Sequence, residues 1–153
     1  MKRVLEKVTN KNNLDLELYR TWFNASTYFL ENVTKHVESH GMTVDNFRIL
    51  ELLYSEKETY TLQKISEKLH IPSGSITYVV NRLVKQGYVQ KKPCPTDGRA
   101  SHVVLTTSGE KIIHDIVPEH VKFISSKLGH MDDEEKYTLI KLLGRIGMDS
   151  GKN

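Results

Sequence analysis

The sequence predicts a mainly α-helical fold of the α+β class, in which one short β hairpin accompanies several amphipathic helices. Apolar residues recur at steps of three and four along most of the chain, which is the period of a helix with one buried face. Two segments of alternating polarity flank a run at 93–99 that contains two prolines and a glycine, a pattern typical of a hairpin. Residues suited to helix caps precede the apolar runs and indicate where each helix begins.

Two helices are predicted before residue 60. The first extends from Leu14 to about Ser39 and ends at Gly41, and Thr43 caps the second, which buries Phe47. The polar first twelve residues predict a frayed N-terminal arm. The apolar face of the first helix comprises Leu14, Leu18, Trp22, Ala25, Phe29, Val33 and Val37.

Residues 61–87 predict two further helices joined by a tight turn. Thr61 can cap the first, which stops before Pro72 because proline lacks an amide hydrogen and disfavours a helical residue before it. Ser73 is suited to cap the second helix, and Gly87 suits the left-handed position that follows it. The second helix is expected to bury Ile76, Val79, Val80 and Leu83.

The hairpin comes next, with strands at 88–92 and 101–105 around the irregular loop 93–99. Helix, turn, helix and hairpin in this order describe a winged helix-turn-helix, a module that places its second helix in the DNA major groove. Arg99 is expected at the hairpin tip, where it can enter a minor groove. Asp97, two residues earlier, is expected to hold the guanidinium of Arg99 in place.

The distribution of charge supports DNA as the partner of this module. From Thr61 to Thr106 there are seven Lys or Arg and two acids, a net charge of +5, whereas the other fifteen basic and seventeen acidic residues sum to −2. A localised basic surface is expected where a protein contacts phosphates. The side chains expected to contact bases or phosphates are Ser73, Ser75, Thr77, Tyr78, Asn81, Arg82, Lys85, Lys91, Asp97 and Arg99.

Two helices are predicted after the hairpin. Thr106 or Thr107 opens the first, and Thr107 with Glu110 fits a capping box. Pro118 lies inside this helix and is expected to kink it, because it removes one backbone donor. A second capping box at 132–135 opens the last helix.

The segments 71–83, 87–89, 97–99 and 105–109 together resemble the MarR family of bacterial transcriptional regulators. Length and flanking helices fit as well, so the resemblance covers nearly the whole chain. Gly98 stands where many members carry a second basic residue. The segments 93–97 and 116–120 look like the branch of the family that answers phenolic or quinone-like compounds.

The resemblance implies a homodimer that represses transcription from a pseudo-palindromic operator. Residues 1–40 and 107–153 would form dimerisation helices around a DNA-binding lobe at 41–106. The apolar faces at both ends must be buried somewhere, and a two-fold dimer places two recognition helices about one DNA turn (~34 Å) apart. The alternative is that both ends fold back on their own module as a monomer.

The resemblance also implies an effector cleft where the dimerisation helices meet the DNA-binding lobe. A ligand that binds better when the two lobes are wrongly spaced for DNA would release the operator. Each aromatic near that junction can equally be an ordinary core residue. The candidates for the cleft are Trp22, Phe23, Phe29, Phe47 and Tyr54.

Three further hypotheses concern this same fold. Cys94 lies close to Lys91 and Lys92 in the sequence, and positive charge would favour its thiolate and a redox response. Alternatively, Cys94 is an inert thiol between two prolines.

The module could also bind a protein rather than DNA. A steep dependence of binding on salt concentration would indicate DNA as the partner.

Histidines suggest a zinc-sensing regulator as a further alternative. His36 and His40 are spaced for two zinc ligands on one helix face, and His114 and His120 lie on the long helix after the hairpin. No cysteine or fixed motif accompanies them, and scattered surface histidines are the commoner case, so no metal and no cofactor are predicted.

Composition limits the remaining possibilities. A length of 153 residues predicts one domain, or one domain plus a dimerisation extension. No apolar run of membrane length and no signal-peptide pattern is present, which predicts a cytoplasmic protein without membrane contact. The single cysteine excludes an internal disulfide. The absence of a nucleophile elbow, a Gly-rich phosphate loop or an HExxH motif argues against an enzyme.

Overall fold

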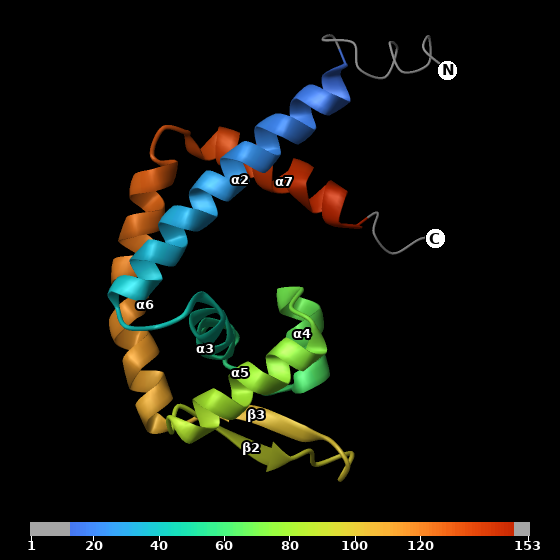
Figure 1. The fold of residues 1–153 in the computed structure, drawn as a ribbon, viewed down its shortest axis with the longest axis vertical. Helices are drawn as coiled ribbons and strands as arrows, with labels where there is room; N and C mark the ends of the chain where they lie inside the picture. Colours follow the sequence, from blue (N-terminus) through green and yellow to red (C-terminus); the bar gives the residue numbers. More distant parts are fainter. Residues whose placement is uncertain (1–12, 149–153) are drawn as a thin grey trace.

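The computed structural model describes residues 13–148, which form six helices and one three-stranded sheet (Figure 1). A compact lobe contains the sheet with α3, α4 and α5, and the longer helices extend away from it. The arm expected at residues 1–12 lies outside the described residues. In chain order the elements are α2 (Leu14–Ser39), α3 (Val44–Glu56), β1 (Tyr60–Thr61), α4 (Leu62–Leu69), α5 (Ser73–Lys85), β2 (Val89–Pro93), β3 (Ser101–Leu105), α6 (Thr107–Leu128) and α7 (Asp133–Met148).

Polar side chains cap several of these helices where the sequence predicted caps. Thr43 Oγ1 accepts a hydrogen bond from the N–H three residues later at 3.3 Å, and Thr61 Oγ1 does the same at 3.2 Å. The capping box of α7 is confirmed as well. Asp132 Oδ1 accepts from the N–H of Glu135 at 2.8 Å, and the Glu135 carboxylate accepts from the N–H of Asp132 at 2.9 Å.

Two predicted helix starts are corrected. The N-cap of α5 is Pro72 rather than Ser73, which is the first helical residue, and no side chain caps this end. Proline holds the extended backbone that an N-cap needs, with φ −53° and ψ 141°. Of the two candidates for α6, Thr106 is the cap and Thr107 already belongs to the helix, so the expected capping box with Glu110 does not form.

The sheet is antiparallel, with strand order β1-β3-β2. The predicted hairpin is β2 and β3, whereas β1 was not predicted because a strand of two residues is too short to show alternation. Pro93 was expected in the loop but ends β2 opposite Ser101, a position that tolerates proline because β2 is an edge strand. Val103 of β3 is fully buried and lies between Tyr60 of β1 and Lys91 of β2.

The core of the lobe holds α5 in place. The four apolar residues predicted for its inner face are all buried, at most 8% exposed, in one cluster with residues of α3, α6 and the sheet. Burying an apolar side chain of this size contributes about 1.5–3 kcal/mol. The position of α5 is therefore set by packing, and its opposite face is left to the surface.

The turn after α5 joins three elements. Gly87 has φ +78°, and the N–H of Tyr88 donates to the carbonyl of Leu83 at 3.0 Å. Thr106, at the start of α6, donates its hydroxyl to the Gly87 carbonyl at 2.5 Å and its N–H to the Tyr88 carbonyl at 3.1 Å. Gly109 in the first turn of α6 lies so close that a Cβ would stand 1.9 Å from the Tyr88 carbonyl oxygen.

The long helix α6 carries the chain away from this turn. It continues through Pro118, which lies inside the helix as predicted. It packs against both α2 and α3, and Figure 1 shows α2 and α6 side by side next to the lobe. Among the helices that the structure describes, none is long and apolar enough to cross a membrane.

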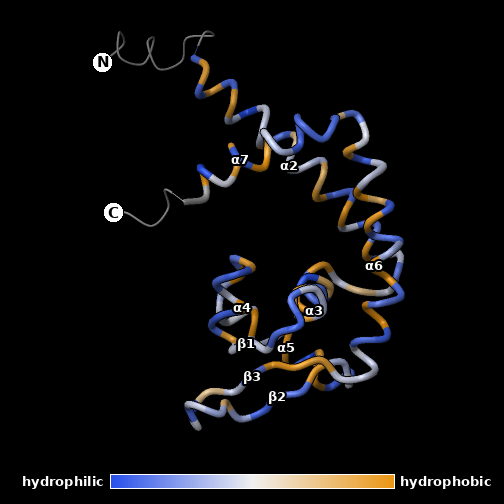
Figure 2. The backbone as a smooth tube through the Cα atoms, turned by 180° about the vertical axis from the view of Figure 1, so that it is seen from behind, coloured by the Kyte–Doolittle hydropathy of each residue, from blue (hydrophilic) through white to orange (hydrophobic). Residues whose placement is uncertain are grey.

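Away from the lobe, α2 and α7 expose apolar side chains. Figure 2 shows hydrophobic positions along both helices where they extend beyond the lobe. Such faces are uncommon on monomeric proteins and mark surfaces for association. The large exposed apolar side chains of these helices are Leu14, Leu18, Tyr19, Trp22, Phe23, Tyr28 and Leu30 on α2, and Tyr137, Leu139, Ile140, Leu142, Leu143 and Ile146 on α7.

Aromatic rings pack together where α2, α3 and α6 meet. The ring of His36 stacks on Phe123 with centroids 4.3 Å apart and lies 5.4 Å from His120. The ring of His120 in turn lies 4.6 Å from Phe47. Nε2 of His36 and Nδ1 of His120 are buried and have no hydrogen-bond partner within residues 13–148.

Burial lowers the pKa of His36 and of His120, because a charged imidazole loses its hydration there. The imidazole of His40 lowers the pKa of His36 further, and the imidazole of His36 lowers the pKa of His120 further. Glu119 raises the pKa of His36 and Glu51 raises the pKa of His120, but burial outweighs both effects. The folded state therefore favours the neutral form of both rings.

We predict that the free energy of unfolding falls as the pH drops below 6.5, the usual pKa of histidine. The unfolded chain then binds protons that the folded state resists, so stability present above pH 6.5 is lost as the pH falls toward the lowered pKa values. Urea unfolding at pH 7.5 and 5.5 measures the loss, which should shrink in His36→Gln. His130→Gln, at an exposed site, is the control; an equal loss in both variants would contradict the assignment.

We predict that Gly109→Ala destabilises the protein by about 2 kcal/mol or more, because the added methyl group overlaps backbone that cannot easily move. Gly144→Ala is the matched control, since a Cβ there meets no atom within 4 Å, and alanine should slightly stabilise that helix. Thermal unfolding measures both variants. Equal stability of the two would mean that the contact between α6 and the turn is looser than described.

Candidate DNA-binding surface

The turn between α4 and α5 is fixed by several hydrogen bonds. His70 takes the left-handed conformation with φ 52°, which ends α4. Ser66 donates its hydroxyl to the Ile71 carbonyl at 2.6 Å, and Arg48 of α3 donates to the Leu69 carbonyl at 2.6 Å. The bond from Arg48 was not predicted, because nothing in the spacing of the sequence places an α3 side chain at the end of α4.

The surface face of α5 carries the polar residues that the sequence assigned to it. The guanidinium of Arg82 lies over the ring of Tyr78, 5.8 Å from its centroid, and Tyr78 is 64% exposed. Thr77 donates its hydroxyl to the carbonyl of Ser73 at 3.0 Å. One helix thus presents the predicted set to solvent, namely Ser73, Ser75, Thr77, Tyr78, Asn81, Arg82 and Lys85.

A groove of about 420 Å³ lies between the start of α3 and this face of α5. The α3 side of the groove is formed by Thr43, Asp45 and Asn46. It was not predicted, because the sequence assigned only a capping role to Thr43 and no role to the other two residues. Asn46 is 4% exposed, and its Oδ1 has no partner within the described part of the chain. The residues from α5 that line the groove are Gly74, Ser75, Tyr78, Val79 and Arg82.

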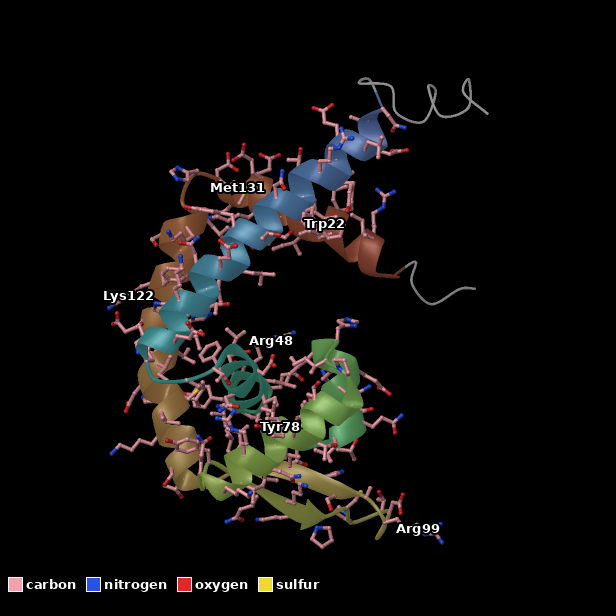
Figure 3. The ribbon with its side chains drawn as sticks, in the orientation of Figure 1. Trp22, Arg48, Tyr78, Arg99, Lys122 and Met131 are labelled. Carbon is pink, nitrogen blue, oxygen red and sulfur yellow. The ribbon has the colours of Figure 1, made fainter. Side chains whose placement is uncertain are left out.

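The hairpin loop places Arg99 at the outer end of the wing, away from the lobe (Figure 3). The N–H of Cys94 donates to the Ala100 carbonyl at 2.9 Å, and that of Ala100 donates to the Asp97 carbonyl at 3.1 Å. The sequence predicted that Asp97 would hold the guanidinium of Arg99. Instead its Oδ1 accepts the backbone N–H of Arg99 at 3.0 Å, because a two-residue separation favours a local turn.

Cys94 is half-buried near the base of this loop, with its Sγ 3.3 Å from Thr96 Oγ1. Hydrogen bonds lower the pKa of the Cys94 thiol. The Thr96 hydroxyl has the largest effect, and the backbone N–H groups of Thr96 and Asp97 add to it. The direction agrees with the sequence hypothesis of a favoured thiolate. The cause differs, since local hydrogen bonds rather than the charges of Lys91 and Lys92 lower the pKa.

Of the four histidines considered as zinc ligands, three lie near one another and the fourth lies apart. The ring of His36 is edge-on to His40 with centroids 4.9 Å apart and lies 5.4 Å from His120. His114 Nδ1 instead shares a hydrogen bond of 2.6 Å with the hydroxyl of Tyr54. Between residues 13 and 148, no three His, Cys, Asp or Glu side chains are grouped so that they could hold a metal ion.

The five aromatics proposed for an effector cleft are not brought together in one place. Phe47 is buried in the lobe core, and Tyr54 is half-buried on the same helix beside α6. Phe29 is half-buried on α2. Trp22 and Phe23 are 43% and 59% exposed, and Figure 3 shows Trp22 far along α2 from the lobe. Only the half of α2 nearest the lobe can contribute to a site with α3.

Comparison with known proteins identifies the family. The model of the MarR family matches residues 40–100. The HTH-type transcriptional regulator MhqR of Bacillus subtilis is 33% identical over 135 residues, which span 88% of this chain and 92% of that protein. The HTH-type transcriptional repressor YetL of the same organism is 26% identical and covers 95% of this chain and 89% of its own length.

Solved structures share the architecture. AbsC, a MarR family transcriptional regulator from Streptomyces coelicolor, superposes with a TM-score of 0.82 at 19% identity over 90% of this chain and 95% of that chain. Another MarR family regulator of that organism, solved in complex with DNA, gives a TM-score of 0.81 at 17% identity over 90% of this chain and 88% of its own. The lobe built around α4, α5 and the β2–β3 wing is thus a winged helix-turn-helix, and the chain belongs to the MarR family of transcription regulators.

Proposed function

We propose that the protein is a homodimeric repressor that binds a pseudo-palindromic operator and is released from it by a small phenolic or quinone-like effector. The observation that carries the proposal is the division of α5 into a buried apolar face and an exposed polar face beside a basic wing. A helix anchored in this way can enter a major groove as a rigid element. One relative solved in complex with DNA supports the same use of the fold.

DNA contact would divide between the helix and the wing. The exposed hydroxyls of α5, its one amide at Asn81 and its one guanidinium at Arg82 can bond base edges or nearby phosphates. Arg99 at the wing tip can enter the adjacent minor groove, while its backbone is held by Asp97. Lys85 adds positive charge at the end of the helix for phosphate contact.

Dimerisation would use the exposed apolar faces of α2 and α7. These faces extend beyond the lobe, so a monomer leaves them in water, whereas a second copy can cover them. The extension of α2 and α7 beyond the lobe supports the expected division into 1–40, 41–106 and 107–153, with Ile113 and Ile116 of α6 packed into the lobe core. A two-fold dimer places the two α5 helices on successive major-groove faces, about 34 Å apart.

Release would depend on the junction of α2, α3 and α6. Tyr54 is half-buried beside α6 and Phe29 is half-buried on α2, so both rings are partly accessible. An effector that prefers a different spacing of the lobes would lower the operator affinity. The resemblance of segments 93–97 and 116–120 to the phenol- and quinone-responsive branch supports that chemical class. A second candidate is an electrophilic effector that reacts with Cys94, favoured by the lowered pKa of its thiol.

Binding of the purified protein to its own upstream promoter DNA tests the proposal, at two salt concentrations and with or without a simple phenol or quinone. We expect saturable binding that weakens steeply with salt, since each phosphate contact releases counterions, and that the compound reverses. Reversal that is lost in Cys94→Ala would favour the reactive thiol over the cleft. Absence of specific binding to this promoter and to a random DNA pool would contradict a DNA-binding role.

We predict that Arg99→Ala lowers operator affinity about tenfold or more while the dimer stays intact, because a charge-assisted contact at the wing tip is lost. Fluorescence anisotropy with operator DNA measures the affinity, and light scattering measures the mass. Lys122→Ala removes one positive charge on α6 outside the proposed surface and serves as the control. If Arg99→Ala binds the operator as tightly as the unaltered protein, the wing tip does not contact DNA.

We predict that Ile140→Glu shifts the protein toward monomers, since a carboxylate on an apolar face would be buried without a partner in the dimer. Ile140 is 66% exposed in the single chain, so a monomeric protein should tolerate the change. Sedimentation equilibrium measures the association constant, which should fall by at least tenfold. A tight dimer that survives this substitution would place the interface elsewhere.

A further inference from the structure

A hydrogen bond links the recognition helix to the first strand of the wing. Lys91 Nζ on β2 donates to Asn81 Oδ1 on α5 at 2.7 Å, across ten residues of sequence, and both side chains lie on the surface. A donor–acceptor distance of this length is typical of a charge-assisted bond. The two residues therefore form one unit on the surface proposed to face DNA.

The register of the sheet explains why Lys91 points toward α5. Lys91 is the antiparallel partner of Val103, which is fully buried, so both belong to the face of the sheet that covers the core. Val89, two residues before Lys91, is buried on that same face. Lys92 pairs with His102 and points to the opposite face. The contact with Asn81 thus follows from strand pairing rather than from a chance orientation.

The chemistry of lysine fixes the orientation of the Asn81 amide. An ammonium group only donates, so the atom that faces it must be the oxygen, and the NH₂ group of Asn81 is directed away from Lys91. One of the three ammonium hydrogens is used in this bond, which leaves two. Of the ion pairs found within residues 13–148, none includes Lys91, so no carboxylate among these residues forms a direct ion pair with it.

We propose that Asn81 and Lys91 together act as a donor-only reading unit, which selects guanine rather than adenine at one position of each operator half-site. An asparagine with a free oxygen reads adenine, since it accepts from N6 and donates to N7. Here the ammonium occupies one side of that oxygen and repels the hydrogens of an adenine amino group. The remaining hydrogens of Asn81 and Lys91 are donors, and guanine presents two adjacent acceptors, O6 and N7.

This inference rests on the proposed DNA-binding function and specifies the base preference of the same surface. Selection from a random pool of duplex DNA tests it with the full-length unaltered protein, Lys91→Met and Lys92→Met. Methionine keeps the length of the side chain and removes the ammonium, which frees Asn81 Oδ1. Lys92→Met is the matched control, because it removes the same charge from the neighbouring position on the other face of the sheet.

We expect the unaltered protein and Lys92→Met to enrich guanine at one position of each half-site, and Lys91→Met to enrich adenine at that position. Replacement of this guanine by adenine in the selected duplex should weaken binding of the unaltered protein about tenfold. The same replacement should not weaken binding of Lys91→Met. Asn81→Asp supplies a second variant, which keeps a partner for Lys91 but loses the amide donors, and should lose the preference for guanine.

Three results would overturn the inference. Unchanged guanine preference in Lys91→Met, with uniformly weaker binding and a shallower salt dependence, would mean that Lys91 contacts a phosphate. Unchanged preference and affinity would mean that the hydrogen bond only braces the wing. Failure of the unaltered protein to enrich any sequence would remove the proposed DNA-binding function itself, and is distinguishable from the first two because it appears without any substitution.

Discussion

The turn that follows α5 is the constraint on which the rest of the structure depends. Gly87 adopts a left-handed conformation there, and its carbonyl and that of Tyr88 both accept hydrogen bonds from Thr106. Helix α5 ends at this turn, the wing begins there, and α6 starts against it. Because Gly109 contacts the Tyr88 carbonyl without room for a side chain, these three elements are held at one point and cannot be adjusted independently.

Much of this architecture could be predicted from local chemistry. Helix boundaries that depend on a capping side chain, such as Thr43 and Thr61, follow from short-range rules, and so does the buried face of α5. Features that depend on distant residues could not be predicted. The two-residue strand β1 exists only because β3 lies beside it, and Arg48 reaches the end of α4 only because α3 packs there.

The candidate site likewise combines features that could be predicted from local chemistry with features that depend on distant residues. The surface positions on α5 could be assigned from helical period, since the residues opposite them are apolar. The pairing of Asn81 with Lys91 could not, because it depends on strand register. The wing shows a further limit: a carboxylate near an arginine suggested an ion pair, but the short separation of Asp97 and Arg99 produced a backbone bond instead. Aromatic composition likewise did not indicate that Trp22 lies far along α2 from the lobe, whereas Phe47 is buried in the lobe core.

The length of α6 has a mechanical consequence. Its 22 residues span about 33 Å at 1.5 Å per residue, with one end against the turn after α5 and the other beyond the lobe. If the far end of α6 is held by a second subunit, this helix acts as a lever arm for the recognition helix. A tilt of about 6° would displace the end near α5 by about 3.4 Å, which is the rise of one base pair along a DNA strand. A tilt of this size would therefore be enough to shift α5 by one base pair relative to the proposed operator.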